Sequence, residues 1–185
     1  MTMALICIGL LALLLGWGAW VFNRLVRLRN QVNTAWADID VQLTRRHDLV
    51  PALVAAVKAY AGHESAVLQA VTQLRAQAVA QKGRARLGEV ESSLEQALGN
   101  LLALKEAYPD LKANENFAQL QRDLVDTEEQ LQYARRFYNG AVRDYRDGIQ
   151  RVPDVLIARG FGFREAEFFQ AEDESRAAVR VEMVR

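Results

Sequence analysis

Residues Ala4–Phe22 read ALICIGLLALLLGWGAWVF, a stretch of 19 uncharged residues. At about 1.5 Å per residue, such a helix crosses a hydrocarbon core of roughly 30 Å, which takes about 20 apolar residues. A cleaved signal peptide, the alternative, would have a positively charged start, a shorter apolar centre and an Ala-x-Ala-like end. The sequence therefore favours an uncleaved transmembrane anchor over residues 1–23. Residues spaced along the span, with aromatic side chains at its interfacial end, are Ala4, Leu10, Leu14, Trp17, Trp20 and Phe22.

The flanks of this span predict its orientation. Arg24, Arg27 and Arg29 follow the span, and no Lys or Arg precedes it. The positive-inside rule then predicts a single-pass protein with a short outside N-terminus and a cytoplasmic body. The same arginines could instead serve the first helix of the body.

The composition of the remaining chain is typical of long helices. Lys+Arg and Asp+Glu balance at 23 each, so there is no excess of positive charge that would indicate binding to nucleic acid. Ala, Leu, Gln, Glu and Arg are abundant, and there are 3 Pro. The single cysteine, Cys7, lies in the apolar run, so neither an intrachain disulfide nor a thiol metal site is expected.

Apolar residues in alternating three- and four-residue steps predict an all-α body with coiled-coil-like helices. A shorter stripe, from Leu87 to Tyr108, stops at Pro109-Asp110. The longest stripe belongs to a last helix that starts near Leu111. Its members are Phe117, Leu120, Leu124, Thr127, Leu131, Ala134, Tyr138, Ala141, Tyr145, Ile149 and Val152.

The beginning of the body allows two interpretations. In the favoured one, the first helix ends near Arg46, and Asp48 caps a second helix over residues 49–80 that has a weak point at Gly62. In the other, one helix runs from Ala4 to Ala80 with a kink at Pro51. Four helices with short turns predict an antiparallel up-down-up-down bundle over residues 24–152. Residues 153–185 are predicted to be an aromatic segment with a loose polar end after Glu172.

No arrangement of residues predicts catalysis. His47 and His63 are sixteen residues apart, and Thr44 and Tyr60 stand where a di-iron bundle would need Glu. Two histidines without usable cysteines do not make a zinc site, and Gly160-Phe161-Gly162 is no phosphate loop. We therefore predict a protein without a cofactor that is not an enzyme.

Several short segments resemble the LemA family, in the right order and over nearly the whole chain after the anchor. They are LRNQV at 28–32, AWADIDVQL at 35–43, RRHDLVP at 45–51, ARRFYN at 134–139, and Phe161-Gly162-Phe163 followed by Phe168-Phe169. The resemblance implies a membrane-anchored helical-bundle protein of the bacterial cell membrane. The family's biochemical function is not established, and a member implicated in bacterial magnetic-organelle membranes hints at membrane organisation.

Two clusters are candidates for an interaction surface. One lies between Asp38 and Asp48, where a capped, salt-bridged helix turn is the favoured interpretation and a docking surface for a partner is the alternative. The other would bring residues 28–30 of the first body helix, the ARRFYN segment and the aromatic tail to the membrane-facing end. A simple cap on the core is the favoured interpretation there, and contact with the lipid interface is the alternative. Tyr138 is predicted to pack inward there, with its hydroxyl bonded to a polar partner such as Asn30. The candidate residues are Asn30, Trp36, Asp40, Arg45, Arg46, Asp48, Arg135, Tyr138, Asn139, Phe161, Phe163, Phe168 and Phe169.

The favoured function is a non-catalytic membrane scaffold that organises membrane proteins or self-associates, with the lipid bilayer and a protein partner or second copy as its partners. The alternative is an accessory or regulatory subunit of a membrane enzyme such as a protease.

Overall fold

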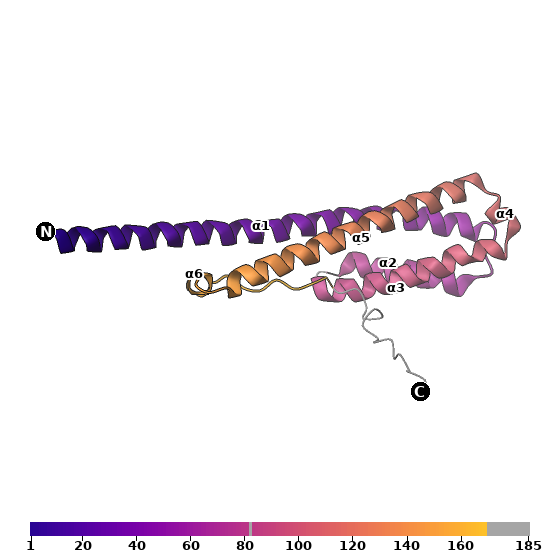
Figure 1. Cartoon of the computed structure of the whole chain (residues 1–185). Helices are drawn as coiled ribbons and strands as arrows, with labels where there is room; N and C mark the ends of the chain where they lie inside the picture. The colour runs from indigo at the N-terminus through magenta and orange to yellow at the C-terminus, as the bar shows by residue number, and fades with distance from the viewer. Residues whose placement is uncertain (82, 170–185) are drawn as a thin grey trace, which may run out of the picture. The chain divides into compact units, whose positions relative to one another are not determined.

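The computed structural model describes residues 1–81 and 83–169, and in these ranges the chain is helical without a strand. The predicted all-α class is therefore confirmed. Residues 170–185, with the end predicted to be loose after Glu172, lie outside the described ranges. Figure 1 shows the elements α1 (Thr2–Lys58), α2 (Ser65–Ala80), α3 (Arg84–Ala103), the 3-10 helix η1 (Leu104–Glu106), α4 (Pro109–Lys112), α5 (Glu115–Gln150) and α6 (Asp154–Gly160).

The helices form two compact units. Residues 1–40 and 133–168 make unit 1, while residues 41–132, joined by Phe169, make unit 2. Helices α1 and α5 run through both units, so each is considered below in two parts. The arrangement of residues 24–152 as one antiparallel four-helix bundle stays a prediction.

In unit 1, the first part of α1 packs against the last part of α5. Gly148 of α5 allows a close approach, because a Cβ at this position would lie 2.8 Å from Leu28 Cδ1. The predicted stripe is buried here at Ala134, Tyr138, Ala141, Tyr145 and Ile149. Val152, predicted to continue it, is instead 80% exposed, because α5 ends at Gln150 before the stripe reaches it.

The apolar run of α1 stands out in unit 1. Among the described residues, α1 is the one helix long and apolar enough to cross a membrane. Its most apolar 18-residue window has a mean hydropathy of 2.3, and only 6% of that window is buried. The length and composition of the run thus fit a transmembrane span, and the leucine side chains of the run are exposed.

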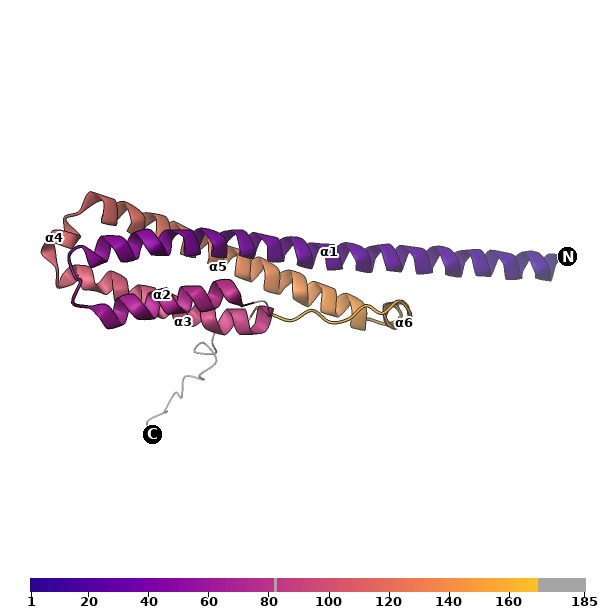
Figure 2. The ribbon, with the colours of Figure 1, turned by 180° about the vertical axis from the view of Figure 1, so that it is seen from behind.

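Unit 2 has its own hydrophobic core, to which four long helices contribute. The members share a helical spacing that turns one face of each helix inward. They are Val50, Leu53 and Val57 of α1, Leu68, Val71 and Ala78 of α2, Leu94, Ala97, Leu98 and Leu101 of α3, and Phe117 and Leu124 of α5, together with Leu111 of α4 and Ala61. Helices α2 and α3 lie side by side in Figures 1 and 2 and contact each other extensively.

The favoured prediction for the start of the body is wrong. Helix α1 continues through Arg46, Asp48 and Pro51 to Lys58, and the chain turns near Gly62 before α2 begins. The alternative prediction, a single helix that runs to Ala80, is also wrong, because α1 passes Pro51 but ends at Lys58. A proline inside a helix costs about 3 kcal/mol. Burial of Leu53, Val57 and their neighbour Val50 offsets this cost, because each fully buried aliphatic side chain contributes about 1.5–3 kcal/mol.

A side chain from another helix replaces the hydrogen bond that Pro51 removes. Proline has no backbone N–H, so the carbonyl of His47, four residues earlier, loses its helical donor. Arg75 Nε of α2 donates to this oxygen at 2.7 Å. The arginine thereby gives the unpaired carbonyl of α1 a hydrogen-bond donor and connects α2 to α1.

We expect Arg75→Met to lower the free energy of unfolding by about 1–2 kcal/mol, because it keeps the aliphatic stem but removes the donor to the His47 carbonyl. Pro51→Ala restores a backbone donor to the same oxygen. In that background Arg75→Met should cost about half as much or less. A double-mutant cycle measured by urea unfolding checks the coupling, and equal costs in both backgrounds would show that the bond to His47 is not the reason for Arg75.

The start of the last long helix also differs from the prediction. Leu111 belongs to the short α4, and α5 begins at Glu115. Asn114 explains the boundary, since its Oδ1 accepts the Phe117 backbone N–H at 2.9 Å, the geometry of an N-cap. The third helix likewise ends before the predicted Pro109 stop, because α3 tightens into η1 at Leu104.

Candidate functional site

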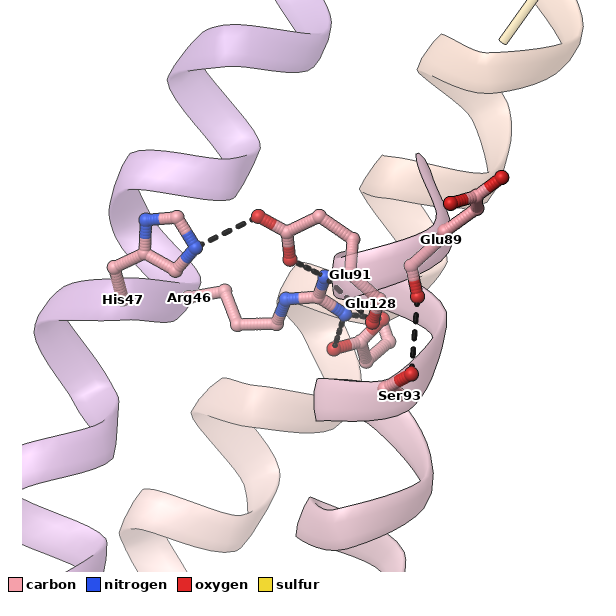
Figure 3. A network of polar contacts seen from close by, with 6 residues as sticks. All are labelled: Arg46, His47, Glu89, Glu91, Ser93 and Glu128. Atoms are coloured by element: carbon pink, nitrogen blue, oxygen red, sulfur yellow. Dashed lines mark hydrogen bonds and ion pairs between the residues drawn. The ribbon is translucent and has the colours of Figure 1, made fainter. Parts of the chain in front are cut away.

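A buried polar network joins three helices in unit 2, as Figure 3 shows. Arg46 of α1 donates from Nη1 to both carboxylate oxygens of Glu128 on α5, at 2.8 and 3.1 Å. Its Nη2 pairs with the Glu91 carboxylate of α3 and lies 3.4 Å from the Glu91 backbone oxygen. His47 Nε2 lies 2.8 Å from Glu91 Oε1. The side chains of Arg46 and Glu91 are completely buried.

Glu91 and Glu128 were missed in the sequence, although a signal was present. Glu91 lies four residues after Leu87 and three before Leu94, so it occupies the apolar face of α3. A carboxylate on such a face requires a buried cation. The RRHD segment contains two arginines that could supply this cation. Arg46 is the buried one and supplies it, whereas the adjacent Arg45 is exposed.

The network holds Arg46 and Glu91 in the charged state. Burial disfavours the charge on Arg46, but Glu128 and Glu91 outweigh burial and raise the pKa of the guanidinium. Burial likewise opposes the charge on Glu91, yet the hydrogen bond with His47 and the charge of Arg46 prevail and lower the pKa of this carboxyl. Glu91 is therefore a carboxylate in the folded protein at neutral pH.

Acid should weaken the contribution of Glu91. Its folded-state pKa lies below the ordinary 4.5, so in acid the unfolded chain takes up a proton before the folded one does. The stabilisation is complete above pH 4.5 and is lost as the pH falls through the folded-state value. We expect Glu91→Gln to destabilise most at about pH 7, and the gap to the parent protein to narrow toward about pH 3. Urea unfolding across this range, with the exposed Glu89→Gln as control, measures it; a gap independent of pH would contradict it.

A second cluster, in unit 1, brings the aromatic tail to α1. Phe22 makes edge contacts with Phe161 and Phe163, with ring centroids 5.0 and 5.6 Å apart. The Arg29 guanidinium lies 5.3 Å from the Phe163 ring centroid. Further along, the Arg146 guanidinium lies 5.0 Å from the Phe168 ring centroid. The predicted approach of the tail to the end of the apolar run is therefore observed.

Tyr138 has the predicted inward phase and a polar partner other than Asn30. Its ring is fully buried and meets Trp36 edge-on at 5.4 Å. Its hydroxyl donates to the backbone oxygen of Glu167 at 2.6 Å, so the predicted polar partner is present, but it is not Asn30. The reason is that the tail segment runs beside α5 and offers a carbonyl, while the Asn30 side chain is exposed.

The candidate surface residues fall into three groups. Four are buried and cannot contribute to a docking surface in this structure: Arg46, Arg135, Tyr138 and Phe169. Three are half-buried: Trp36, Asn139 and Phe163. The others are exposed: Asn30, Asp40, Arg45, Asp48, Phe161 and Phe168. An interaction role for the exposed and half-buried residues stays a prediction.

The charged groups of the network are paired with one another. In the network every carboxylate meets a cation or His47, and the Arg46 head group is committed to Glu91 and Glu128. Within residues 1–81 and 83–169, no group of three or more His, Cys, Asp or Glu side chains could hold a metal ion. Because its side chains come from α1, α3 and α5, the network links these three helices, and we call it the clamp.

Together, the apolar run of α1 and the helical body define an all-helical, membrane-associated protein. Residues 35–183 match the LemA family, and the chain belongs to that family. This confirms the resemblance found in the sequence.

Curated relatives cover a shorter part of the chain. Over 88 residues it is 33% identical to magnetosome proteins MamQ 2 and MamQ 1 of Paramagnetospirillum magneticum, a match covering 48% of this chain and 32% of each relative. Over 87 residues it is 30% identical to magnetosome protein MamQ of Magnetospirillum gryphiswaldense, covering 47% of this chain and 32% of the relative. The match thus spans about a third of the length of these relatives.

Proposed function

We propose that this protein is a non-catalytic, membrane-anchored interaction protein that self-associates or organises other membrane proteins through its helical body. The observation that carries the proposal is an exposed aromatic pair on α5. Tyr133 and Phe137 are 62% and 53% exposed, although they lie outside the apolar run. Being four residues apart, they share one face of the helix.

This pair differs from the aromatic residues that unit 1 uses internally. Tyr138 and Tyr145 of the same helix are buried, whereas Tyr133 is largely exposed and has the Arg136 guanidinium 4.7 Å from its ring centroid. Aromatic residues and arginine are enriched where proteins bind one another, because they bury large areas with few rotatable bonds. A neighbouring helix with an apolar ridge would cover Tyr133 and Phe137.

In this proposal α1 crosses the bacterial cell membrane once, with a short outside N-terminus and a cytoplasmic body that forms an antiparallel four-helix bundle. The arginines after the run support that orientation. Two of them also serve the body, because Arg24 Nη1 bonds Asp154 Oδ2 at 2.8 Å and Arg29 stacks on Phe163. Their contribution to orientation is therefore shared with a structural one.

Crosslinking in intact membranes tests the proposal. Membranes washed with alkaline carbonate should retain the full-length protein, and a lysine-independent photocrosslinker placed at Glu129 should yield a discrete crosslinked product. Tyr133→Ser with Phe137→Ser should reduce that product about tenfold, the effect of losing two aromatic anchors at an interface. Val79→Ser, which removes an exposed apolar side chain from α2, serves as the matched control.

The identity of the product separates the alternatives. A product of two copies of this chain supports self-association, and a mixed set of membrane proteins supports the organising role. Stoichiometric capture of one enzyme would replace both with the accessory-subunit function. If the double serine variant crosslinks as well as the parent protein, the aromatic pair is not the interaction surface.

A further inference from the structure

The short helix α6 lies against the end of the apolar run. Asp154, at its start, accepts the hydrogen bond from Arg24 described above. Ile157 Cδ1 would be 3.7 Å from a Cβ on Gly18, and Phe161, just after α6, contacts Phe22. In Figures 1 and 2 α6 accordingly lies beside α1. If Ala4–Phe22 spans the membrane, as proposed above, α6 lies at the depth of the lipid interface.

A groove lies between α6 and the end of the apolar run of α1. It has a volume of about 430 Å³ and is lined by six residues of α1 between Leu14 and Asn23, together with Ile157 and Phe161. Asn23 is the polar exception in an otherwise apolar lining. Leu14 and Leu15 are well exposed, so the groove is continuous with the outer surface of the span. A space of this kind fits a flexible hydrocarbon chain.

The outer side of α6 is apolar and uncovered in unit 1. Leu156 is 69% exposed and Phe161 is 66% exposed, and neither lies in the run itself. Short segments with apolar residues on one side and cations beside them favour the lipid interface. Residues 151–164 contain three arginines and a single acidic residue, Asp154, whose charge is already paired with Arg24. The exposed Arg151 and Arg159 are therefore suited to an anionic phosphate.

We propose that this groove binds one anionic phospholipid of the surrounding bilayer. An acyl chain lies between α6 and the Leu14–Phe22 part of α1, and the phosphate meets Arg159 and Arg151. Asp154 and Arg24 hold α6 in place so that the groove stays open. The proposal rests on the membrane span but not on any protein partner, and it makes the protein selective for anionic lipid.

Native mass spectrometry of the full-length protein in maltoside micelles tests the site, with phosphatidylglycerol or phosphatidylcholine added as the probe. The parent protein should retain one phosphatidylglycerol and bind phosphatidylcholine more weakly. Gly18→Leu fills the groove and should weaken phosphatidylglycerol binding about tenfold, which corresponds to excluding two or so methylenes. Gly16→Leu makes the same change two residues away, where an added Cβ meets nothing within 4 Å, and should bind like the parent protein.

Surface variants test the head group without touching the packing. Arg159→Gln should reduce phosphatidylglycerol binding more than phosphatidylcholine binding, because the choline cation already offsets the phosphate charge of the second lipid. Arg143→Gln, at an exposed arginine of α5, should change neither. Equal binding by the Gly18 and Gly16 variants, or equal binding of both lipids by the parent protein, would overturn the proposal. The proposal would also be overturned if crosslinking showed that a protein, and not lipid, covers Leu156. Failure of the crosslinking test at Tyr133 and Phe137 would leave these lipid measurements unaffected, so the two proposals fail separately.

Discussion

Arg46→Met should lower the free energy of unfolding by about 3–5 kcal/mol, the cost of breaking a buried ion pair by removing one partner. The Arg46 side chain has no exposed surface, and it is the cation that meets both Glu91 and Glu128. Methionine fills much of the space but leaves the Glu91 carboxylate buried beside His47 alone. Glu128 suffers less, because its side chain is 24% exposed and water can reach it. Urea unfolding of the full-length protein in maltoside micelles, followed by circular dichroism, measures the change.

The neighbouring arginine is a matched control. Arg45→Met makes the same substitution at an exposed position one residue earlier, so it should change stability by no more than about 0.5 kcal/mol. A double variant separates two effects: the loss of attraction between Arg46 and Glu91, and the cost of leaving the Glu91 carboxylate buried without its cation. Combining Arg46→Met with Glu91→Leu removes both buried charges, and it should recover most of the lost stability. Equal losses for Arg45→Met and Arg46→Met would show that the clamp contributes nothing.

The clamp also has a consequence for how the helices register. Arg46 reaches Glu91 on α3 and Glu128 on α5 with one head group, so sliding α3 by a turn would leave the buried Glu91 carboxylate without its cation, and sliding α5 would remove Glu128 from the guanidinium. Apolar side chains in the core of unit 2 are more interchangeable, since a leucine stripe slipped by one heptad still finds leucines. We expect the variant without either charge to be stable but to show broader near-ultraviolet circular dichroism and faster amide exchange.

The sequence predicted the α5 stripe well because a 3.6-residue period over many turns is a strong signal, and nine of its eleven members are buried. It failed where a tertiary contact changes a local preference. Pro51 and Asp48 together resemble a helix start, but Arg75 of α2 satisfies the carbonyl that proline leaves open. Nothing in the local sequence predicts that donor, 28 residues away.

The candidate sites show the same limit. The RRHD segment was recognisable as charged and unusual, but the choice between Arg45 and Arg46 as the buried residue depends on which face of α1 meets α3. Helix α6 was missed because its seven residues give less than two full periods of any pattern. Its contacts with Gly18 and Arg24 join segments more than a hundred residues apart, which periodicity cannot reveal.

Leu124→Asp should unfold unit 2 or cost most of its stability, because an unpaired carboxylate would enter the hydrophobic core. Leu124 is 3% exposed and belongs to the cluster that holds Leu94, Leu101 and Phe117. Losing the leucine contacts alone costs about 2–5 kcal/mol, and burying the charge adds several more. This sum is comparable to the whole stability of a typical domain, about 5–15 kcal/mol. Leu131, with no exposed surface, should respond to Asp in the same way.

Val125 supplies the sharpest control for this effect. It follows Leu124 directly on α5 but points outward and is 46% exposed. Val125→Asp places the same carboxylate one residue along the same helix, and it should cost about 1 kcal/mol or less, as should Arg122→Ala at another exposed position. Thermal unfolding monitored at 222 nm, with limited proteolysis of the body, compares the variants. If Leu124→Asp and Val125→Asp melted together, the stripe that organises α5 would not be the face on which unit 2 folds.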